Sequence, residues 1–239
     1  MANPSTALGT GPSTMPGADG AATMNSHSEH HPRLQHHFYS MDQQLEASTL
    51  GMWVFLVTEV MFFGGLFMAY LVYREAFFHD FEEGSRQLDV SMGAINTVVL
   101  IFSSLTMALA VRSAQVGKKA ALLVNLALTM IFGSVFLVVK YFEYAQKFEH
   151  HHVPGADFVG TAGEQIFFSL YFCLTGLHAI HMIVGLGLMM FIFVNSAKGK
   201  YTPSWYTPVE ISGLYWHFVD IVWIFLFPLL YLIGGRYAL

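Results

Sequence analysis

Five long apolar segments divide the sequence, and this pattern constrains the fold more than any other feature. Each is longer than the ~20 residues that a helix needs to cross a bilayer. Because the bilayer core holds no water to bond exposed backbone groups, such segments are expected to be helices. The predicted fold class is therefore all-α, a polytopic membrane protein with a bundle of five transmembrane helices. The segments lie at about 48–73, 89–113, 119–146, 162–196 and 208–235.

Composition supports a membrane protein and excludes several other classes. Of the 239 residues, 54% are hydrophobic and 11% are charged, against about 25% charged residues in soluble domains. The net charge is -5 and no run of basic residues exceeds two, so we expect no nucleic-acid partner. The single cysteine, Cys173, excludes an internal disulfide framework, a thiolate-held iron–sulfur cluster and a C-x-x-C-H haem attachment on this chain.

The N-terminal part has a different composition from the rest. Residues 1–40 are rich in Gly, Ala, Ser and Pro and lack the apolar stretch of a signal peptide. Such a segment buries too little apolar surface to offset the entropy of ordering. We therefore predict a polar, His-containing, disordered segment at 1–47 and a transmembrane domain at 48–239. The histidines of 27–37 and 150–152 are interpreted as solvated polar tracts rather than metal-binding tails.

The distribution of Lys and Arg in the connectors predicts the orientation. The side that holds the N-terminus has six such residues, and the opposite side has four together with most of the connector acids. We therefore expect the N-terminus in the cytoplasm and the C-terminus outside. The six residues are Arg33, Arg112, Lys118, Lys119, Lys198 and Lys200, and the four are Arg74, Arg86, Lys147 and Arg236.

Glu59 is the only formally charged residue between Leu50 and Val72. An ionised group at the bilayer centre costs about 2.5–3.5 kcal/mol on insertion scales, so such groups usually face the bundle interior and have partners. No cation lies three or four positions from Glu59. Either another helix supplies a hydrogen-bond donor, or the carboxyl stays protonated, which would suit a proton relay. By contrast, Lys140 and Glu143 are three residues apart, and a local ion pair near the membrane boundary explains both.

Two further pairs of polar residues lie inside the apolar segments. His178 and His181 share a helix face by their spacing, but metal sites need three or four ligands, so we favour interhelical hydrogen bonds. His217 and Asp220 have the same spacing and are interpreted as a structural hydrogen bond on one helix. No Ser or Cys motif supplies the nucleophile that a catalytic pair would need.

Several motifs together resemble one known family, the subunit III of haem–copper oxidases. They occur in the order and at the spacing of that family and span about residues 48–235. "GLHAIHMIVG" and "YWHFVDIVW" are the most specific. The matching stretches are TEVMFFGGLFMAY (58–70), INT (95–97), YFEY (141–144), FFSLYFCLTGLHAIHMIVG (167–185) and YWHFVDIVWIFLF (215–227).

The resemblance implies an accessory subunit of a terminal oxidase in aerobic respiratory electron transport. In that family the haems and copper lie on subunits I and II, so this chain would carry no catalytic centre, metal or cofactor of its own. Subunit III packs mainly on subunit I, also meets subunit II and further subunits, holds phospholipid, sustains proton uptake and protects against inactivation during turnover. The residues implied in proton uptake or lipid association are Glu59, Glu143, His178, His181, His217 and Asp220.

Departures from the family pattern refine this expectation. The chain lacks the first two of the seven spans of mitochondrial members and resembles the shorter forms of bacterial plasma membranes. Asn195 stands where some members have an Arg that holds lipid phosphate, and Glu59 stands where quinol-oxidising members tend to have Asp. We therefore expect a cytochrome c oxidase. The alternatives are a quinol oxidase, a nitric oxide reductase-associated protein, or a small proton-coupled transporter, which the absence of an evident internal repeat disfavours.

Overall fold

The computed structural model describes residues 38–149, 153–155, 158–203 and 205–234. Over these residues the chain forms six α-helices and no strand, so the all-α prediction is confirmed. Five helices are long and apolar enough to cross a membrane, as the sequence predicted. The helices are α1 (Met41–Ala76), α2 (Phe78–Arg86), α3 (Val90–Val116), α4 (Lys119–Glu149), α5 (Ala162–Ala197) and α6 (Thr207–Tyr231).

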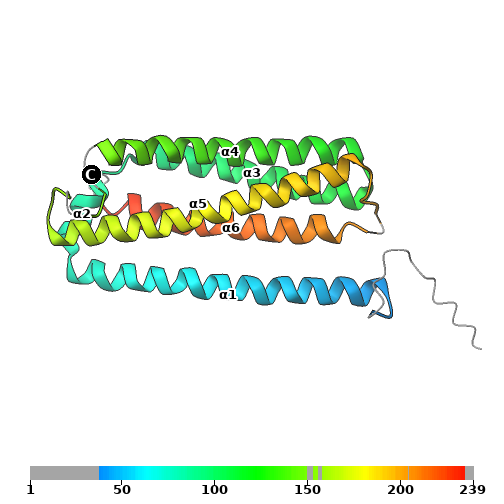
Figure 1. Cartoon of the computed structure of the whole chain (residues 1–239), viewed down its shortest axis with the longest axis horizontal. Helices are drawn as coiled ribbons and strands as arrows, with labels where there is room; N and C mark the ends of the chain where they lie inside the picture. Colours follow the sequence, from blue (N-terminus) through cyan, green and yellow to red (C-terminus); the bar gives the residue numbers. More distant parts are fainter. Residues whose placement is uncertain (1–37, 150–152, 156–157, 204, 235–239) are drawn as a thin grey trace, which may run out of the picture.

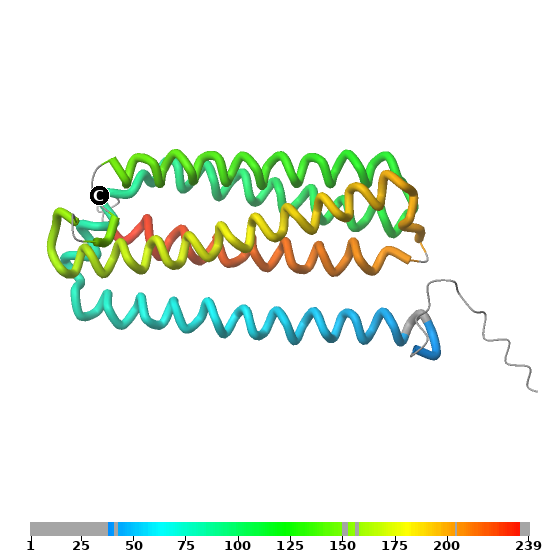
Figure 2. The backbone as a smooth tube through the Cα atoms, in the orientation of Figure 1, coloured from blue at the N-terminus to red at the C-terminus, as the bar shows by residue number. Residues whose placement is uncertain are grey.

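The long helices lie side by side along one common direction (Figure 1). Helices α3, α4, α5 and α6 form a four-helix group, while α1 runs along one side of it and packs against α5 and α6. The tube view follows the chain from the N-terminal end of α1 to the far end of α6, at the opposite end of the bundle (Figure 2). Each long helix reverses the direction of the previous one. Because the number of spans is odd, the start of α1 and the end of α6 lie at opposite ends of the bundle.

Two features differ from the sequence prediction. Helix α1 begins at Met41, seven residues before the predicted start of the first span, while the remaining N-terminal tail lies outside the described residues. The connector after α1, for which no helix was predicted, contains α2. It is amphipathic: Phe81 is fully buried against Tyr70 and Phe167, while most of its charged side chains lie nearer the surface. This short helix closes one end of the bundle.

Helix ends are fixed by local hydrogen bonds. Asp89 caps α3 by accepting from the backbone N–H groups of Ser91 and Met92. Thr161 and Glu164 form a reciprocal capping box at the start of α5. Gly117 ends α3 with φ 77°, a left-handed conformation that glycine adopts without steric cost. Helix α4 follows after one residue, so α3 and α4 form a tight antiparallel pair.

A large buried tryptophan fixes the contact among three helices. The Trp216 ring of α6 fits against Gly133 of α4 and Gly185 of α5, where an added Cβ would lie 2.7 and 2.9 Å from the ring. Its indole Nε1 donates to Ser103 Oγ of α3 at 3.0 Å. Gly133 and Gly185 therefore let the three helices approach closely. At Gly64 and Gly65, by contrast, an added Cβ would meet nothing within 4 Å among the described residues.

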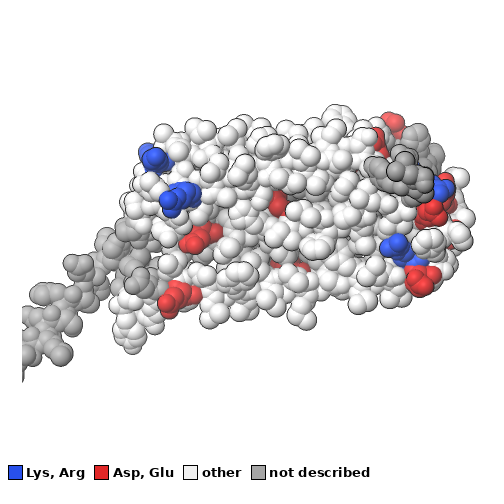
Figure 3. All heavy atoms as spheres, turned by 180° about the vertical axis from the view of Figure 1, so that it is seen from behind, with Lys and Arg blue, Asp and Glu red and all other residues white. Residues whose placement is uncertain are grey.

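The surface matches a membrane environment. On the face seen in Figure 3 the basic and acidic side chains gather at the two ends of the bundle, and a broad middle band is nearly free of charge. Many large apolar side chains of the long helices are exposed, among them Met61 and Phe225. Lipid tails are a suitable solvent for such a surface, whereas water is not.

The five spans and the Lys/Arg bias predict that the termini lie on opposite sides of the membrane, with the N-terminus inside. Reporter fusions at Met1 and Leu239 test this arrangement. A reporter active only in the cytoplasm should work at Met1 and fail at Leu239, and a periplasmic reporter should give the reverse. The same behaviour at both ends would contradict a five-span topology.

Candidate functional site

The partner of Glu59 comes from another helix. Glu59 of α1 lies with its Oε2 atom 3.1 Å from Nε2 of His181 on α5. The two side chains are 19% and 16% exposed. The edge of the Phe63 ring packs on the His181 ring, and Tyr215 donates to the His181 backbone oxygen. Of the two possibilities left open by the sequence, a partner on another helix is therefore present.

The hydrogen bonds of His181 determine how protons are placed in this pair. Its Nδ1 atom lies 2.8 Å from the Leu177 backbone oxygen, which can only accept, so Nδ1 carries a proton. The bond between Nε2 and Glu59 then holds one further proton, either on the carboxyl or on the ring. Both forms have zero total charge. This explains how an acid can occupy an apolar span without a nearby Lys or Arg.

An apolar groove lies beside the pair. Its volume is about 380 Å³, and its walls come from α1, α5 and α6. The His181 ring and the Tyr215 hydroxyl are among the few polar groups at its edge. The remaining lining residues are mostly apolar and include Met52, Phe55 and Leu188. The groove suits a hydrocarbon chain and offers no cluster of charges for a polar substrate.

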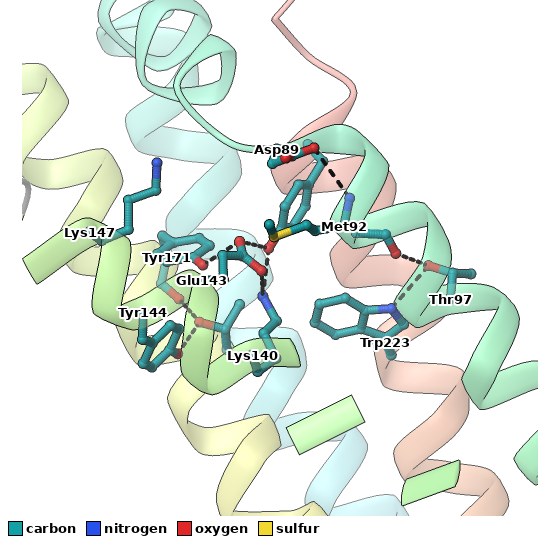
Figure 4. A network of polar contacts seen from close by, with 12 residues as sticks. Asp89, Met92, Thr97, Lys140, Glu143, Tyr144, Lys147, Tyr171 and Trp223 are labelled. Atoms are coloured by element: carbon teal, nitrogen blue, oxygen red, sulfur yellow. Dashed lines mark hydrogen bonds and ion pairs between the residues drawn. The ribbon is translucent and has the colours of Figure 1, made fainter. Parts of the chain in front are cut away.

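A second polar cluster lies buried near the C-terminal end of α4. Lys140 Nζ is 3.0 Å from Glu143 Oε2, so the ion pair predicted from their spacing is present. The cluster extends further than one helix, because Tyr171 of α5 donates to Glu143 Oε1 at 2.8 Å and Tyr231 of α6 donates to the same atom. Figure 4 shows Lys140, Glu143 and Tyr171 converging between the helices.

Several further groups stabilise the ammonium group of Lys140. Nζ also bonds the Tyr231 hydroxyl at 2.5 Å and lies 4.7 Å from the centre of the Trp223 ring, a cation–π distance. Trp223 in turn donates to Thr97 at 3.0 Å. Lys140 and Glu143 are 5% and 1% exposed. The paired charges and their donors join α3, α4, α5 and α6, which indicates a structural role for Glu143.

The two histidines of α5 do not form one site. His178 is 1% exposed and packs between the rings of Phe136 and Trp223, each 5.3 Å away. Neither of its ring nitrogens has a hydrogen-bond partner among the described residues. Residues three apart on a helix differ by about 60° in direction, which is enough to send His181 toward α1 and His178 into the interior. The expected interhelical hydrogen bond of His178 was therefore wrong.

The predicted hydrogen bond between His217 and Asp220 is also absent. His217 Nδ1 instead meets the Ser104 hydroxyl of α3 at 2.8 Å. Asp220 is 3% exposed, and both carboxyl oxygens lack a hydrogen bond among the described residues. Sequence reasoning missed Ser104, because a serine in an apolar span more often bonds its own backbone.

Over the described residues, no group of three or more His, Cys, Asp and Glu side chains could hold a metal ion. The histidines near the N-terminus and at 150–152 lie outside these residues, so their interpretation as solvated tracts stays a prediction. The His181 nitrogens and the His217 Nδ1 atom are already engaged in bonds. The candidate site is therefore a set of acids and histidines within the spans. Some of them are hydrogen-bonded, whereas His178 and Asp220 have no hydrogen bond among the described residues.

Comparison with known families decides the wider assignment. The family described as cytochrome c oxidase subunit III matches residues 34–235. The chain belongs to this family. The matched region contains all five spans and all six polar residues that the resemblance singled out, so the family recognised from the sequence motifs is confirmed.

Individual relatives cover most of the chain. Cytochrome c oxidase subunit 3 of Corynebacterium diphtheriae is 34% identical over 187 residues, which are 77% of this chain and 87% of the relative. Cytochrome bo(3) ubiquinol oxidase subunit 3 of Pseudomonas putida is 32% identical over 189 residues, covering 79% and 87%. Cytochrome c oxidase subunit 3 of Synechocystis is 34% identical over 184 residues, covering 77% and 74%. The relatives thus serve oxidases with two different electron donors.

Replacing one member of the buried Lys140–Glu143 pair should be costly. Lys140→Met leaves a buried carboxylate without its cation, and such a change typically costs about 3–5 kcal/mol of stability. Lys140→Met combined with Glu143→Gln removes both charges and keeps an acceptor for the two tyrosines, so it should recover most of the loss. Unfolding in detergent, followed by the melting temperature, measures both variants.

Glu82→Gln is the matched control, because it removes an ion pair with the half-exposed Arg86 at the protein surface. Such surface pairs contribute about 0–1 kcal/mol, so the melting temperature should hardly change. A double variant that is less stable than Lys140→Met would show that the charges themselves stabilise the bundle.

Glu59 should react with a hydrophobic carbodiimide, which partitions into the bilayer and needs a protonated carboxyl. The proton shared with His181 supplies this form, and the adjacent groove supplies access. Mass spectrometry of peptides should locate the adduct on Glu59 and find none in Glu59→Gln. Glu143 serves as an internal control, because it is paired with Lys140 and almost fully buried. Equal labelling of Glu143 would contradict the difference between the two sites.

Proposed function

We propose that the chain is the accessory, non-redox subunit of a haem–copper terminal oxidase. Membership of the subunit III family and five helices able to span a membrane support this role. The observation that carries it is the pairing of Glu59 with His181: an acid with no Lys or Arg near it on its own helix is hydrogen-bonded to a histidine of another span. Such a pair can keep or pass a proton, and it provides no site for oxygen chemistry.

The haems and copper would then lie on partner subunits, with subunit I as the main contact and subunit II nearby. Within the complex the chain would stabilise subunit I, support its proton uptake and limit inactivation during turnover. Phospholipid bound in the groove beside Glu59 would complete the packing around α1. The complex is an oxygen-reducing, proton-pumping enzyme of a bacterial plasma membrane, with the N-terminus of this chain in the cytoplasm.

We assign cytochrome c as the electron donor. The support is the residue at position 59, a Glu where quinol-oxidising members tend to have Asp. The relatives include both kinds of oxidase, so a quinol oxidase is the second candidate. Reduced cytochrome c and a reduced quinol, offered separately to the purified complex, distinguish the two by their rates of oxygen consumption.

Gentle purification tests the accessory role. A tagged chain in mild detergent should carry haem absorbance with it, whereas the chain separated from its partners should be colourless and hold no stoichiometric copper or iron by elemental analysis. One tightly bound redox metal per separated chain would contradict the proposal. The proposal would also be contradicted if haem never co-purified with the tagged chain from membranes that contain the oxidase.

The Glu59→Gln variant extends this test to turnover. Gln keeps the volume and can still hydrogen-bond His181, so the complex should assemble and its initial oxygen consumption should stay close to that of the wild type. Because the variant removes the exchangeable carboxyl proton, activity should decline faster over successive turnovers, or proton pumping should fall. An immediate, near-total loss of oxygen reduction with the haems in place would mean that Glu59 takes part in the reaction itself.

A further inference from the structure

His178 is a buried polar side chain that stays outside the hydrogen bonds of the neighbouring Lys140 cluster. It is 1% exposed, and neither of its ring nitrogens has a hydrogen-bond partner among the described residues. A neutral imidazole has one nitrogen that donates and one that accepts. Leaving such a group unpaired in the interior is unfavourable, because its bonds to water have been given up on folding. His178 therefore needs a partner that the described side chains do not supply directly.

Lys140 has one hydrogen-bond donor that is not used. Its ammonium group has three N–H donors. One of them bonds Glu143 Oε2 at 3.0 Å and another bonds the Tyr231 hydroxyl at 2.5 Å. The Trp223 ring attracts the charge as a whole and supplies no acceptor atom. Because Lys140 is only 5% exposed, bulk water does not serve its third N–H.

The unused donor and the unpaired histidine lie against the same aromatic ring. The centre of the Trp223 ring is 5.3 Å from the centre of the His178 ring and 4.7 Å from Lys140 Nζ. Figure 4 shows Lys140 extending toward Glu143 beside Trp223. Lys140 belongs to α4 and His178 to α5, and no direct hydrogen bond joins them. Two polar groups in such an arrangement are commonly joined through water.

The other donors of this cluster are already engaged. The Trp223 indole donates to a threonine of α3, and the hydroxyls of Tyr171 and Tyr231 both donate to Glu143. None of these three groups has a second proton to offer to His178. Within the cluster, Lys140 is therefore the side chain that can still donate.

We propose that an ordered water molecule bridges Lys140 and His178. The water accepts from the third N–H of Lys140 and donates to one ring nitrogen of His178. The other ring nitrogen faces the Phe136 and Trp223 rings, whose faces accept an N–H weakly. The bridge joins α5 to the charged cluster of α4, and it does not depend on the function proposed above.

The charges around the site favour water over an ion. Glu143 already balances Lys140, so an added anion would be a buried charge without a partner. The described residues contain no group of three or more His, Cys, Asp and Glu side chains that could hold a metal ion. Water is neutral and both donates and accepts. Buried waters occur about once per 27 residues and make about three hydrogen bonds each.

Replacement of His178 in two backgrounds tests the bridge. His178→Leu removes the acceptor and leaves the water and the Lys140 N–H without it, so the melting temperature of the full chain in detergent should fall by at least about 2 °C. In the Lys140→Met, Glu143→Gln double variant no ammonium is present, and the same change should have a clearly smaller effect. His178→Gln keeps a donor and an acceptor and should retain most of the stability.

The opposite results would overturn the proposal. An unchanged or higher melting temperature in His178→Leu would mean that the histidine has no hydrogen bond to lose. An equal loss in both backgrounds would mean that the bond does not involve Lys140. Met182→Leu is the matched control, because Met182 is fully buried one turn further along α5 and the change conserves volume. Its effect should be the same in both backgrounds, and a dependence as large as that of His178 would assign the coupling to packing.

High-resolution cryo-electron microscopy gives a second readout that needs no variant. In the wild-type protein, purified with the subunits that accompany it, density for a water should lie about 2.7–3.2 Å from both Lys140 Nζ and one His178 nitrogen. Density in contact with only one of the two side chains would overturn the bridge. A map that resolves other buried waters and shows none at this position would overturn it as well.

Discussion

The middle of a bilayer contains no water, so a polar side chain placed there can be satisfied only by other protein groups. This constraint organises the bundle. Backbone N–H and C=O groups bond to each other within each helix, so hydrogen bonds between helices are made mainly by side chains. Examples are the pairs Trp216 and Ser103, Trp223 and Thr97, and His217 and Ser104. Each of these bonds joins α6 to α3, and α6 has the largest buried share of the five spans. Helix α6 is therefore the centre of the packing, and the other long helices are arranged around it.

The sequence predicted the parts of the fold that depend on local pattern. Five apolar segments of sufficient length fixed the fold class, and a spacing of three residues correctly paired Lys140 with Glu143, since both lie on one helix. The family motifs also predicted the assignment that the comparisons confirm. These features can be predicted from the sequence because the length of an apolar segment and the periodicity of a helix are properties of a single segment.

The remaining contacts depend on how separate helices meet, which the spacing along one helix does not specify. His181 joins Glu59 across 122 positions of sequence, and Tyr231 reaches Glu143 across 88. The same spacing that worked for Lys140 failed for Asp220, because His217 found a closer partner in Ser104 on α3. Nothing in the run around Ser104 marks it as the residue facing α6. The short helix α2 was missed because its charges suggested a solvent-exposed connector, although Phe81 is buried in the core.

The three acids within the spans, two of them buried and Glu59 partly exposed, differ in how completely hydrogen bonds satisfy them. Glu143 accepts from Lys140 on one carboxyl oxygen and from two tyrosine hydroxyls on the other, so both of its oxygens are satisfied. Glu59 has a single side-chain partner, the His181 ring, and the pair lies beside an apolar groove. Asp220 has no hydrogen bond of its own among the described residues and lines a groove at the bundle surface. Asp220 is buried nearly as completely as Glu143, yet only Glu143 is hydrogen-bonded, whereas the more exposed Glu59 has a partner. The depth of an acid in the bundle therefore does not decide whether it is satisfied; the side chains that the neighbouring helices bring to it do.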